Sequence, residues 1–187
     1  MRRSGVLLPV TSLPSRFGIG TFSKEAYAFV DFLKEAGQKL WQILPLGPTG
    51  YGDSPYQAFS TFAGNPYLID LEELIENGWL TEEECENTDW GGSKSYVDYE
   101  KMYQGRFPLL RKAYHNSHIA ENAEFIAFCE ENDWWLSDYA LFMAIKDSQG
   151  GASFLEWDAP LKLREPEAIR RCRHELSDEI CFWQFLQ

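Results

Sequence analysis

The sequence predicts an α/β protein that begins with one β-α-β unit and continues as a mostly helical chain. Two short apolar runs, at residues 5–10 and 40–44, flank a segment with helical periodicity. A strand, a helix and a second strand within about forty residues imply parallel strands joined by a right-handed crossover. Beyond residue 70 the patterns are helical, and no third core strand is evident before the sequence ends.

The first strand is expected at residues 5–10, where an apolar run is bordered by turn-forming residues. Such a run is typical of a buried strand followed by a loop. It is too short for the apolar region of a signal peptide, and Pro9 interrupts it. No other segment approaches the roughly 20 apolar residues that a membrane span requires.

A helix is expected next, with Ser23 as its N-cap and Glu25 in the positive first turn. Its apolar residues recur every three or four positions and therefore line one face: Ala26, Phe29, Val30 and Leu33. Gly37 is expected to end this helix. The second strand then covers residues 40–44, and Pro45 stops it.

Residues 47–65 form a long loop, rich in Gly, Pro, Ser and aromatic residues, without helical or strand periodicity. Long irregular loops in compact domains are usually functional. This loop follows a strand, at the edge where parallel sheets and barrels gather their ligands. We expect residues 67–71 to close the loop as a short strand.

The following chain is predicted to be helical. Gly78 ends a first short helix, and Thr81 begins another because acidic residues fill the turn after it. The first of these covers residues 71–77. The other helices are expected at residues 99–114, 121–131, 134–146 and 167–186, the last of them opened by Pro166.

Composition and charge exclude several classes of partner. Of the 187 residues, 44% are hydrophobic and 25% are charged, as in ordinary globular proteins. The net charge of −12 argues against nucleic acid, which needs a basic face, and against anionic membrane surfaces. Aromatic residues make up 16%, a share that suits a cleft for flat, partly polar ligands.

No metal or cofactor is expected. The four cysteines contain no C-x-x-C pair, so they suggest neither a zinc site nor a disulfide framework, and we interpret them as reduced thiols of a cytoplasmic protein: Cys85, Cys129, Cys172 and Cys181. The spacing of His115 and His118 could place both imidazoles on one helical face, where they could bind a metal ion. We prefer the interpretation that they lie at a solvated helix end. No phosphate-binding glycine motif follows a strand.

The loop contains the most informative residues, Gly-Tyr-Gly-Asp-Ser-Pro-Tyr-Gln at 50–57. Its glycines let the backbone approach a ligand closely. Tyr51 and Tyr56 each offer a flat apolar face and a hydroxyl, which match the C–H face and hydroxyl rim of a sugar. Polar neighbours add donors and acceptors: Asp53, Ser54 and Gln57. An alternative is that the aromatic residues only pack the loop, and the residues alone leave both interpretations open.

Residues 50–57, continued by Ala-Gly-Asn-Pro-Tyr-Leu-Ile-Asp at 63–70, resemble the N-terminal signature of amylomaltases. These are bacterial 4-α-glucanotransferases of a type similar to the plant disproportionating enzyme, grouped as glycoside hydrolase family 77. Further matches lie at residues 4–8, 11–15, 18–20, 97–99 and 135–143. The resemblance therefore extends from about residue 4 to the end of the sequence.

The resemblance implies a (β/α)8 TIM barrel with a largely helical insertion subdomain. Residues 1–70 would form the first β-α-β unit with the substrate-binding loop, and residues 71–187 the insertion that leads back to the barrel. It also implies a glycosyltransferase that moves α-1,4-glucan segments between maltooligosaccharides with retention of configuration. A carboxylate nucleophile and a second carboxyl group, acting as acid and then base, perform such a reaction.

Roles for individual residues follow from the same resemblance. Tyr56 is expected to stack on the sugar at the cleavage point, and Asp53, Ser54 and Gln57 would shape that wall of the cleft. Tyr51 and Tyr99 match aromatic residues that hold glucan at an accessory groove.

The catalytic motifs of the family are missing from residues 1–187. The sequence contains no Arg-x-Asp-His, Glu-Asp-Leu-Gly or His-Asp motif. A complete barrel needs about 250 residues, whereas this sequence offers two barrel strands. We therefore expect part of a longer enzyme, inactive alone, and either marginally stable or self-associating in isolation. Its open strand edges would lack partners. The apolar end of its last helix is interpreted as core, although in part of a longer enzyme it would lack its partners and could drive self-association: Phe182, Trp183, Phe185 and Leu186.

Two alternative functions stay open. One is a non-catalytic carbohydrate-binding module that uses Tyr51, Tyr56 and Tyr99. The other is a helical interaction protein in which the aromatic residues only pack. The loop signature favours sugar binding over the interaction protein, and the incomplete barrel favours part of an enzyme over a self-sufficient module.

Overall fold

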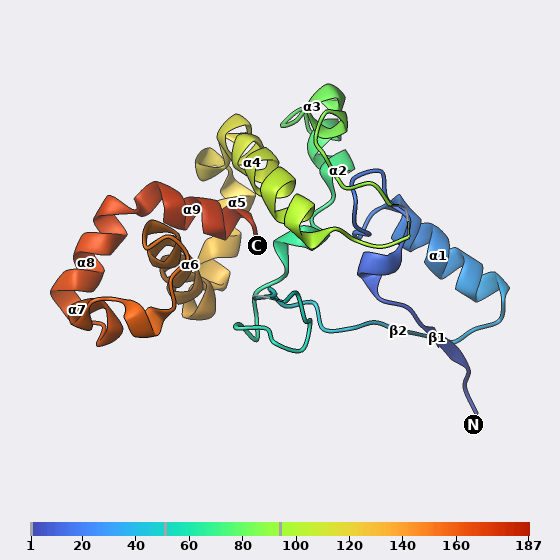
Figure 1. Ribbon diagram of the computed structural model, residues 1–187, viewed down its shortest axis with the longest axis horizontal. Helices are drawn as coiled ribbons and strands as arrows, with labels where there is room; N and C mark the ends of the chain where they lie inside the picture. Colours follow the sequence, from blue (N-terminus) through green and yellow to red (C-terminus); the bar gives the residue numbers. More distant parts are fainter. Residues whose placement is uncertain (1, 51, 94) are drawn as a thin grey trace. The chain divides into compact units, whose positions relative to one another are not determined.

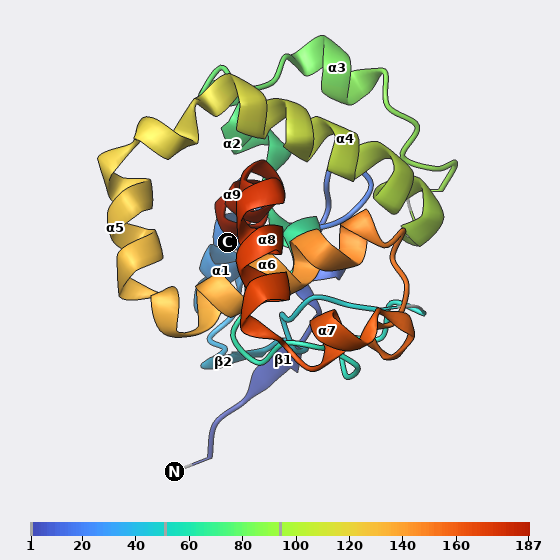
Figure 2. The same ribbon diagram turned by 90° about the vertical axis from the view of Figure 1, so that its left-hand side faces the viewer.

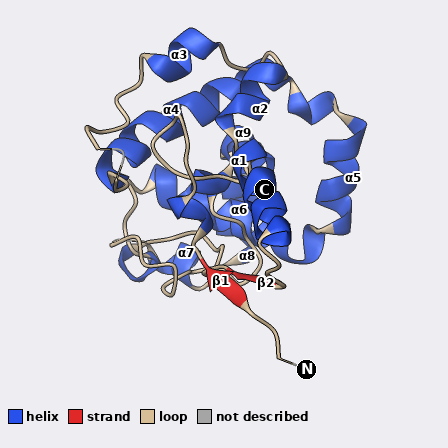
Figure 3. Cartoon of the chain, turned by 90° about the vertical axis from the view of Figure 1, so that its right-hand side faces the viewer, coloured by secondary structure: helices blue, strands red, loops and turns tan. Residues whose placement is uncertain are grey.

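The computed structural model describes residues 2–50, 52–93 and 95–187 (Figure 1). The chain folds into two compact units, Met1–Ser117 and His118–Gln187. The described structure is mostly helical, with one small sheet of two strands, β1 (Gly5–Leu7) and β2 (Leu40–Gln42) (Figure 3). The predicted division at residue 70 into a barrel start and an insertion stays a prediction.

The first unit opens with the expected β-α-β unit. β1 and β2 pair in parallel, with Val6 opposite Trp41, and α1 (Lys24–Glu35) connects them. The indole nitrogen of Trp41 donates a hydrogen bond to the Leu8 carbonyl at 2.8 Å, which ties the second strand to the end of the first. A cluster of apolar side chains then fills the space around α1: Val10, Leu13, Ala26, Leu8, Phe29, Trp41, Ile43, Leu46 and Leu68.

The prediction that residues 5–10 form a buried strand is wrong in its burial. The regular strand covers only Gly5–Leu7, and the side chains of Val6 and Leu7 are exposed. Because the described sheet has two strands, each of them keeps one edge without a neighbouring strand. The apolar run therefore predicted the position of the strand, but it did not predict whether other elements bury its side chains.

The ends of α1 confirm the sequence analysis. The Ser23 hydroxyl accepts a hydrogen bond from the backbone N–H of Glu25 at 3.3 Å, as an N-cap does. Gly37 has φ +72°, the left-handed conformation that commonly follows a helix end. Of the predicted apolar face, Ala26 and Leu33 are buried, whereas Val30 remains exposed.

Beyond these elements, the described part of the first unit combines irregular loops with helices. It contains two short 3-10 turns, η1 (Val10–Ser12) and η2 (Pro66–Leu68), and three helices, α2 (Leu71–Glu76), α3 (Glu82–Glu86) and α4 (Tyr99–Ser117). The predicted helix start at Thr81 is confirmed by a capping box, in which the Thr81 and Glu84 side chains accept hydrogen bonds from each other's backbone N–H groups at 3.3 and 2.9 Å.

The strand predicted at residues 67–71 is wrong. The Asn65 side chain accepts from the Tyr67 N–H at 3.0 Å and starts η2. The Asp70 side chain accepts from the Glu72 N–H at 3.1 Å and starts α2. Short polar side chains that bond nearby backbone groups favour turns and helix starts over sheet ladders, and here two of them act in succession.

The second unit contains five helices and two 3-10 turns in its described residues (Figure 2). They are η3 (Ile119–Glu121), α5 (Ala123–Glu131), α6 (Asp133–Ser148), η4 (Phe154–Glu156), α7 (Ala159–Lys162), α8 (Pro166–Glu175) and α9 (Ser177–Phe185). α6 packs along α9, and α5 and α8 also contact α6. Basic residues of α8 pair with acids, for example Arg173 with Asp138 at 3.5 Å.

The single helix predicted at residues 167–186 is wrong, because two helices occupy this segment. Leu176 leaves helical geometry, with φ −107° and ψ 23°, and separates α8 from α9. The break allows α9 to follow α6 on an axis of its own, with Phe182 and Trp183 buried. This apolar end packs as core in the described structure, while self-association of the chain stays a prediction.

No helix in the described part of the chain is long and apolar enough to cross a lipid bilayer.

Candidate functional site

The loop at residues 47–65 returns to the point where it starts. The Asn65 N–H donates to the Leu46 carbonyl at 2.8 Å, so the two ends of the loop meet. A Cβ atom on Gly47 would lie 2.8 Å from the Cβ of Ala58, which is a steric clash, so glycine fits at this position and a larger residue does not. The Ser60 hydroxyl accepts from the Ala63 N–H at 3.1 Å. The loop is therefore compact and positioned by its own contacts.

Asp53 has the most unusual backbone in this loop. Its φ is +53°, in the left-handed region that residues other than glycine seldom adopt. Its N–H donates to the Gly50 carbonyl at 3.1 Å, and the Thr49 hydroxyl lies 3.5 Å from its carboxylate. Burial raises the pKa of Asp53, and the Thr49 bond opposes this. Strained backbone of this kind is concentrated at ligand-binding sites.

The conformation of Asp53 leads to a prediction. Asp53→Asn should leave the free energy of unfolding within about 0.5 kcal/mol of the wild type, because Asn tolerates the left-handed region. Asp53→Val should cost about 1–3 kcal/mol, because a β-branched residue is strained at this φ. Urea unfolding followed by circular dichroism measures both. Equal stability of the two variants would contradict the inference that the positive φ of residue 53 strains a β-branched side chain.

Asp53 lies near tyrosines that come from two other segments. The ring of Tyr67, in η2, has its centroid 6.1 Å from that of Tyr99, the first residue of α4. Burial raises the pKa of Tyr67 to about 12, and the charge of Asp53 is the next contribution. The pKa of Tyr99 is likewise raised by burial and then by Asp53. The structure thus brings Asp53 and Tyr99, both predicted from the sequence, to one place.

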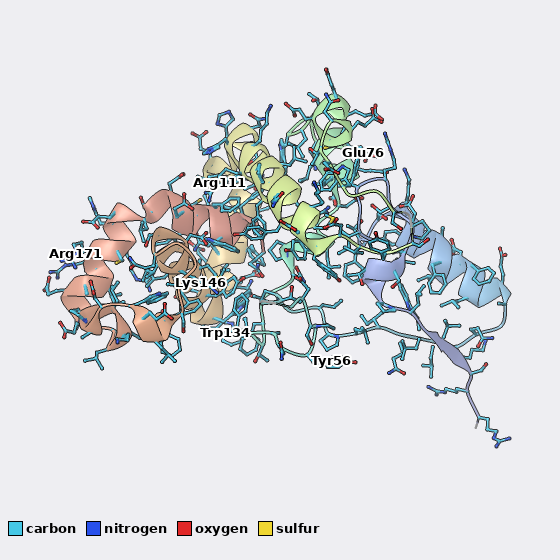
Figure 4. The ribbon with its side chains drawn as sticks, viewed as in Figure 1. Tyr56, Glu76, Arg111, Trp134, Lys146 and Arg171 are labelled. Carbon is cyan, nitrogen blue, oxygen red and sulfur yellow. The ribbon has the colours of Figure 1, made fainter. Side chains whose placement is uncertain are left out.

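Other predicted site residues lie on the exposed part of the loop. The Gln57 N–H donates to the Ser54 carbonyl at 3.1 Å and forms a tight turn. The Tyr56 side chain, within this turn, is 73% exposed and projects from the loop (Figure 4). Gln57 is exposed and Ser54 is half-buried. Tyr51 lies outside the described residues, so its predicted role stays a prediction.

Sequence reasoning missed two tyrosines of this site. Tyr67 belongs to the quoted 63–70 signature but received no role, and Tyr103 was not considered at all. Tyr103 contributes to the raised pKa of Tyr67, after burial and Asp53. The sequence held a signal for Tyr103, because Tyr99, Tyr103 and Phe107 recur every four residues in a predicted helix and so share one face.

A buried arginine, Arg106, lies near Tyr67. Arg106, in α4, is fully buried and donates a hydrogen bond to the Ile69 carbonyl, between η2 and α2. Burial lowers the pKa of Arg106 to about 10, and the charge of Asp70 is the largest effect opposing this. Arg106 therefore links α4 to the backbone segment that carries Tyr67.

The described residues contain no group of three or more His, Cys, Asp or Glu side chains placed to hold a metal ion. α4 ends at Ser117, and His118 has a left-handed backbone with φ +48°. The two histidines considered as a pair on one helical face therefore do not belong to one helix.

Comparison with known proteins gives consistent matches. Residues 8–187 match the glycoside hydrolase 77 family, described as 4-alpha-glucanotransferase. The chain is 47% identical over 190 residues to the 4-alpha-glucanotransferase of Thermus thermophilus and 46% identical over 178 residues to that of Clostridium butyricum. These matches cover 100% and 95% of this chain but 37% of each relative, so the chain spans little more than a third of their length.

Two solved structures are similar to the model. The amylomaltase from Streptococcus agalactiae in complex with acarbose has a TM-score of 0.95 and 45% identity, covering 100% of this chain and 38% of that one. The amylomaltase from Corynebacterium glutamicum has a TM-score of 0.70 at 18% identity, covering 99% of this chain and 26% of that one, and supports the fold alone.

Proposed function

Because the chain belongs to the glycoside hydrolase 77 family of 4-alpha-glucanotransferases, we propose that it forms the glucan-binding wall of an enzyme that transfers α-1,4-glucan segments between maltooligosaccharides. The observation that carries this proposal is the convergence of Asp53 with Tyr67 and Tyr99 beside a loop that exposes Tyr56. Aromatic faces next to hydroxyl and carboxylate groups suit a sugar, which has an apolar face and a polar rim.

The same proposal includes a (β/α)8 barrel, of which residues 1–70 form the first β-α-β unit and residues 71–187 a helical insertion. The exposed apolar side chains of Val6 and Leu7 support it, because a strand in a closed barrel is covered by neighbouring strands and helices. The four free cysteines are consistent with a cytoplasmic protein.

The proposed reaction is a double displacement that retains configuration, with two carboxyl groups supplied by the whole enzyme from outside residues 1–187. Within this chain, Tyr56 would stack on the sugar at the cleavage point, with Asp53, Ser54 and Gln57 shaping the wall. Tyr51 and Tyr99 would hold glucan at the accessory groove. The chain would then contribute binding and orientation, and other parts of the enzyme the chemistry.

Maltotriose can test whether the catalytic carboxylates are absent from residues 1–187. Transfer between two maltotriose molecules yields maltopentaose and glucose, so glucose release measures the reaction. We expect no glucose from the purified 187-residue chain. Glucose together with maltopentaose would show that the nucleophile lies within residues 1–187, and Asp53 would be the first residue to examine.

The binding role predicts an effect of Tyr56→Ala on affinity for acarbose, the ligand in the complex of the Streptococcus agalactiae relative. We expect about tenfold weaker binding by calorimetric titration, because one exposed ring stops stacking on the sugar. Tyr27→Ala is the matched control, since Tyr27 is 74% exposed on α1 and Tyr56 is 73% exposed. Equal affinities of the two variants would contradict the role of Tyr56.

A further inference from the structure

The second unit contains an apolar cavity that belongs to no part of the proposed glucan site. It has a volume of about 280 Å³ and is lined by residues of α6, η4, α7 and α8 (Figure 2). Leu141 and Ile145 of α6 are buried in its lining, and Leu161 of α7 and Ile169 of α8 add aliphatic surface. A cavity of about 150 Å³ with such a lining is large enough for benzene, so this one accommodates a larger apolar group.

Two aromatic residues give the cavity a firm wall. Phe142, in α6, and Trp157 contact each other with 5.3 Å between their ring centroids. Trp157 is buried, and its indole nitrogen donates to the Ala152 carbonyl at 3.2 Å, which fixes the orientation of the ring. A wall that is already ordered loses little entropy when a ligand binds against it.

Two exposed cations also line the cavity, at its opening: Lys162 and Arg164. The Lys162 ammonium donates to the Leu155 carbonyl at 3.1 Å and keeps its positive charge beside η4. Arg164 donates through Nη2 to Asp138 at 2.7 Å, and since a guanidinium has five N–H donors, others remain for a ligand. Residues 159–173 contain five basic and two acidic side chains, in a chain whose net charge is −12.

The backbone at Arg164 indicates a use for its side chain. The Arg164 N–H donates to the Leu161 carbonyl at 3.1 Å and the Glu165 N–H to the Pro160 carbonyl at 2.8 Å, so α7 ends in a Schellman motif. Arg164 occupies the left-handed position of this motif, with φ +53°, where glycine is usual because a side chain is strained. The helix end alone favours glycine, whereas an arginine here supplies a guanidinium to the cavity.

From this combination we propose that the cavity binds a small amphipathic anion, a carboxylate with an alkyl chain of about eight carbons. The apolar lining buries the chain, and Lys162 and Arg164 form charge-assisted hydrogen bonds with the carboxylate. A glucan fits this cavity poorly, because aliphatic side chains would leave its hydroxyl groups without partners. The site lies within the second unit, so the inference does not depend on the proposed glucan-binding function.

Octanoate is the probe for this site. Calorimetric titration of the 187-residue chain should give a dissociation constant of about 0.1–1 mM, an affinity in keeping with a ligand of this size. Acetate and octylammonium should bind at least about tenfold more weakly, because acetate lacks the chain and the two cations repel an ammonium. Lys162→Glu should weaken octanoate binding at least about tenfold, and Phe154→Ala, in η4, about three- to fivefold.

Arg171→Glu is the matched control for Lys162→Glu. Arg171 is exposed on α8 outside the cavity lining, and its replacement changes the net charge equally (Figure 4). We expect less than about a twofold loss, since exposed charges at a distance are screened. Equal losses from the two variants, equal binding of octanoate and octylammonium, or no binding of octanoate would each overturn the inference. A dimer in sedimentation that Phe154→Ala dissociates would assign the cavity to a second copy of the chain and overturn it too.

Discussion

Replacing Arg106 with alanine is expected to lower the free energy of unfolding of the first unit by about 3–5 kcal/mol. The side chain is fully buried in α4, donates to the Ile69 carbonyl and lies near the Asp70 carboxylate. Alanine would leave that carbonyl without this donor, Asp70 without its nearby cation, and a cavity where the long side chain had been. Each of these costs free energy, and all of them arise at one place.

Arg106→Met separates volume from polarity in this prediction. Methionine fills much of the same space without a donor or a charge, so we expect a smaller loss of about 1–3 kcal/mol. Urea unfolding followed by circular dichroism gives both values from the midpoint and the slope. An Arg106→Ala variant within about 1 kcal/mol of the wild type would contradict a structural role for this guanidinium.

Trp183→Ala should cost the second unit about 3–5 kcal/mol of unfolding free energy. Trp183, in α9, is 4% exposed, and its indole nitrogen donates to the Asp147 carboxylate of α6 at 2.9 Å. Its ring meets the Tyr139 ring of α6 edge-on, with 6.3 Å between the centroids. Alanine would therefore remove both the packing and the hydrogen bond that join these two helices.

Trp134 provides the matched control, because it lies on α6 and is 68% exposed (Figure 4). Trp134→Ala should change the unfolding free energy by less than about 0.5 kcal/mol, as most surface substitutions do. Trp183→Phe keeps an aromatic ring and should lose about 1–2 kcal/mol, chiefly the indole hydrogen bond. Similar losses for Trp183→Ala and Trp134→Ala would show that the α6–α9 contact does not stabilise this unit.

The candidate site was partly predictable. The loop composition identified Asp53, and the resemblance identified Tyr99, and the structure brings the two together. Tyr67 and Arg106 were missed because a tyrosine or an arginine in a sequence looks the same whether it is buried or exposed. Only their burial, and the bond from Arg106 to the Ile69 carbonyl, reveal that they support the site.

The errors in the fold have a common origin. Residues 67–71 look like a strand because they are apolar, but Asn65 and Asp70 each cap a turn and override that pattern. Residues 167–186 look like one helix because their helical pattern is continuous, but the packing of α9 on α6 accompanies a break at Leu176. In the first case two capping side chains outweighed the average character of the segment, and in the second the break accompanies the packing of a whole helix.

The sequence by itself determined the family, the parallel β-α-β start, and helix ends such as Ser23, Thr81 and Gly37. The helix ends depend on residues within about four positions of each other, so local hydrogen bonding and periodicity reveal them. The two strands are visible as short apolar runs, and the family is visible as a motif that keeps its residues in order along the chain. Only the tertiary structure decided that the loop, η2 and α4 gather Asp53 with the tyrosines. Such a meeting depends on how buried side chains fill space between segments far apart in the chain, which no local pattern encodes.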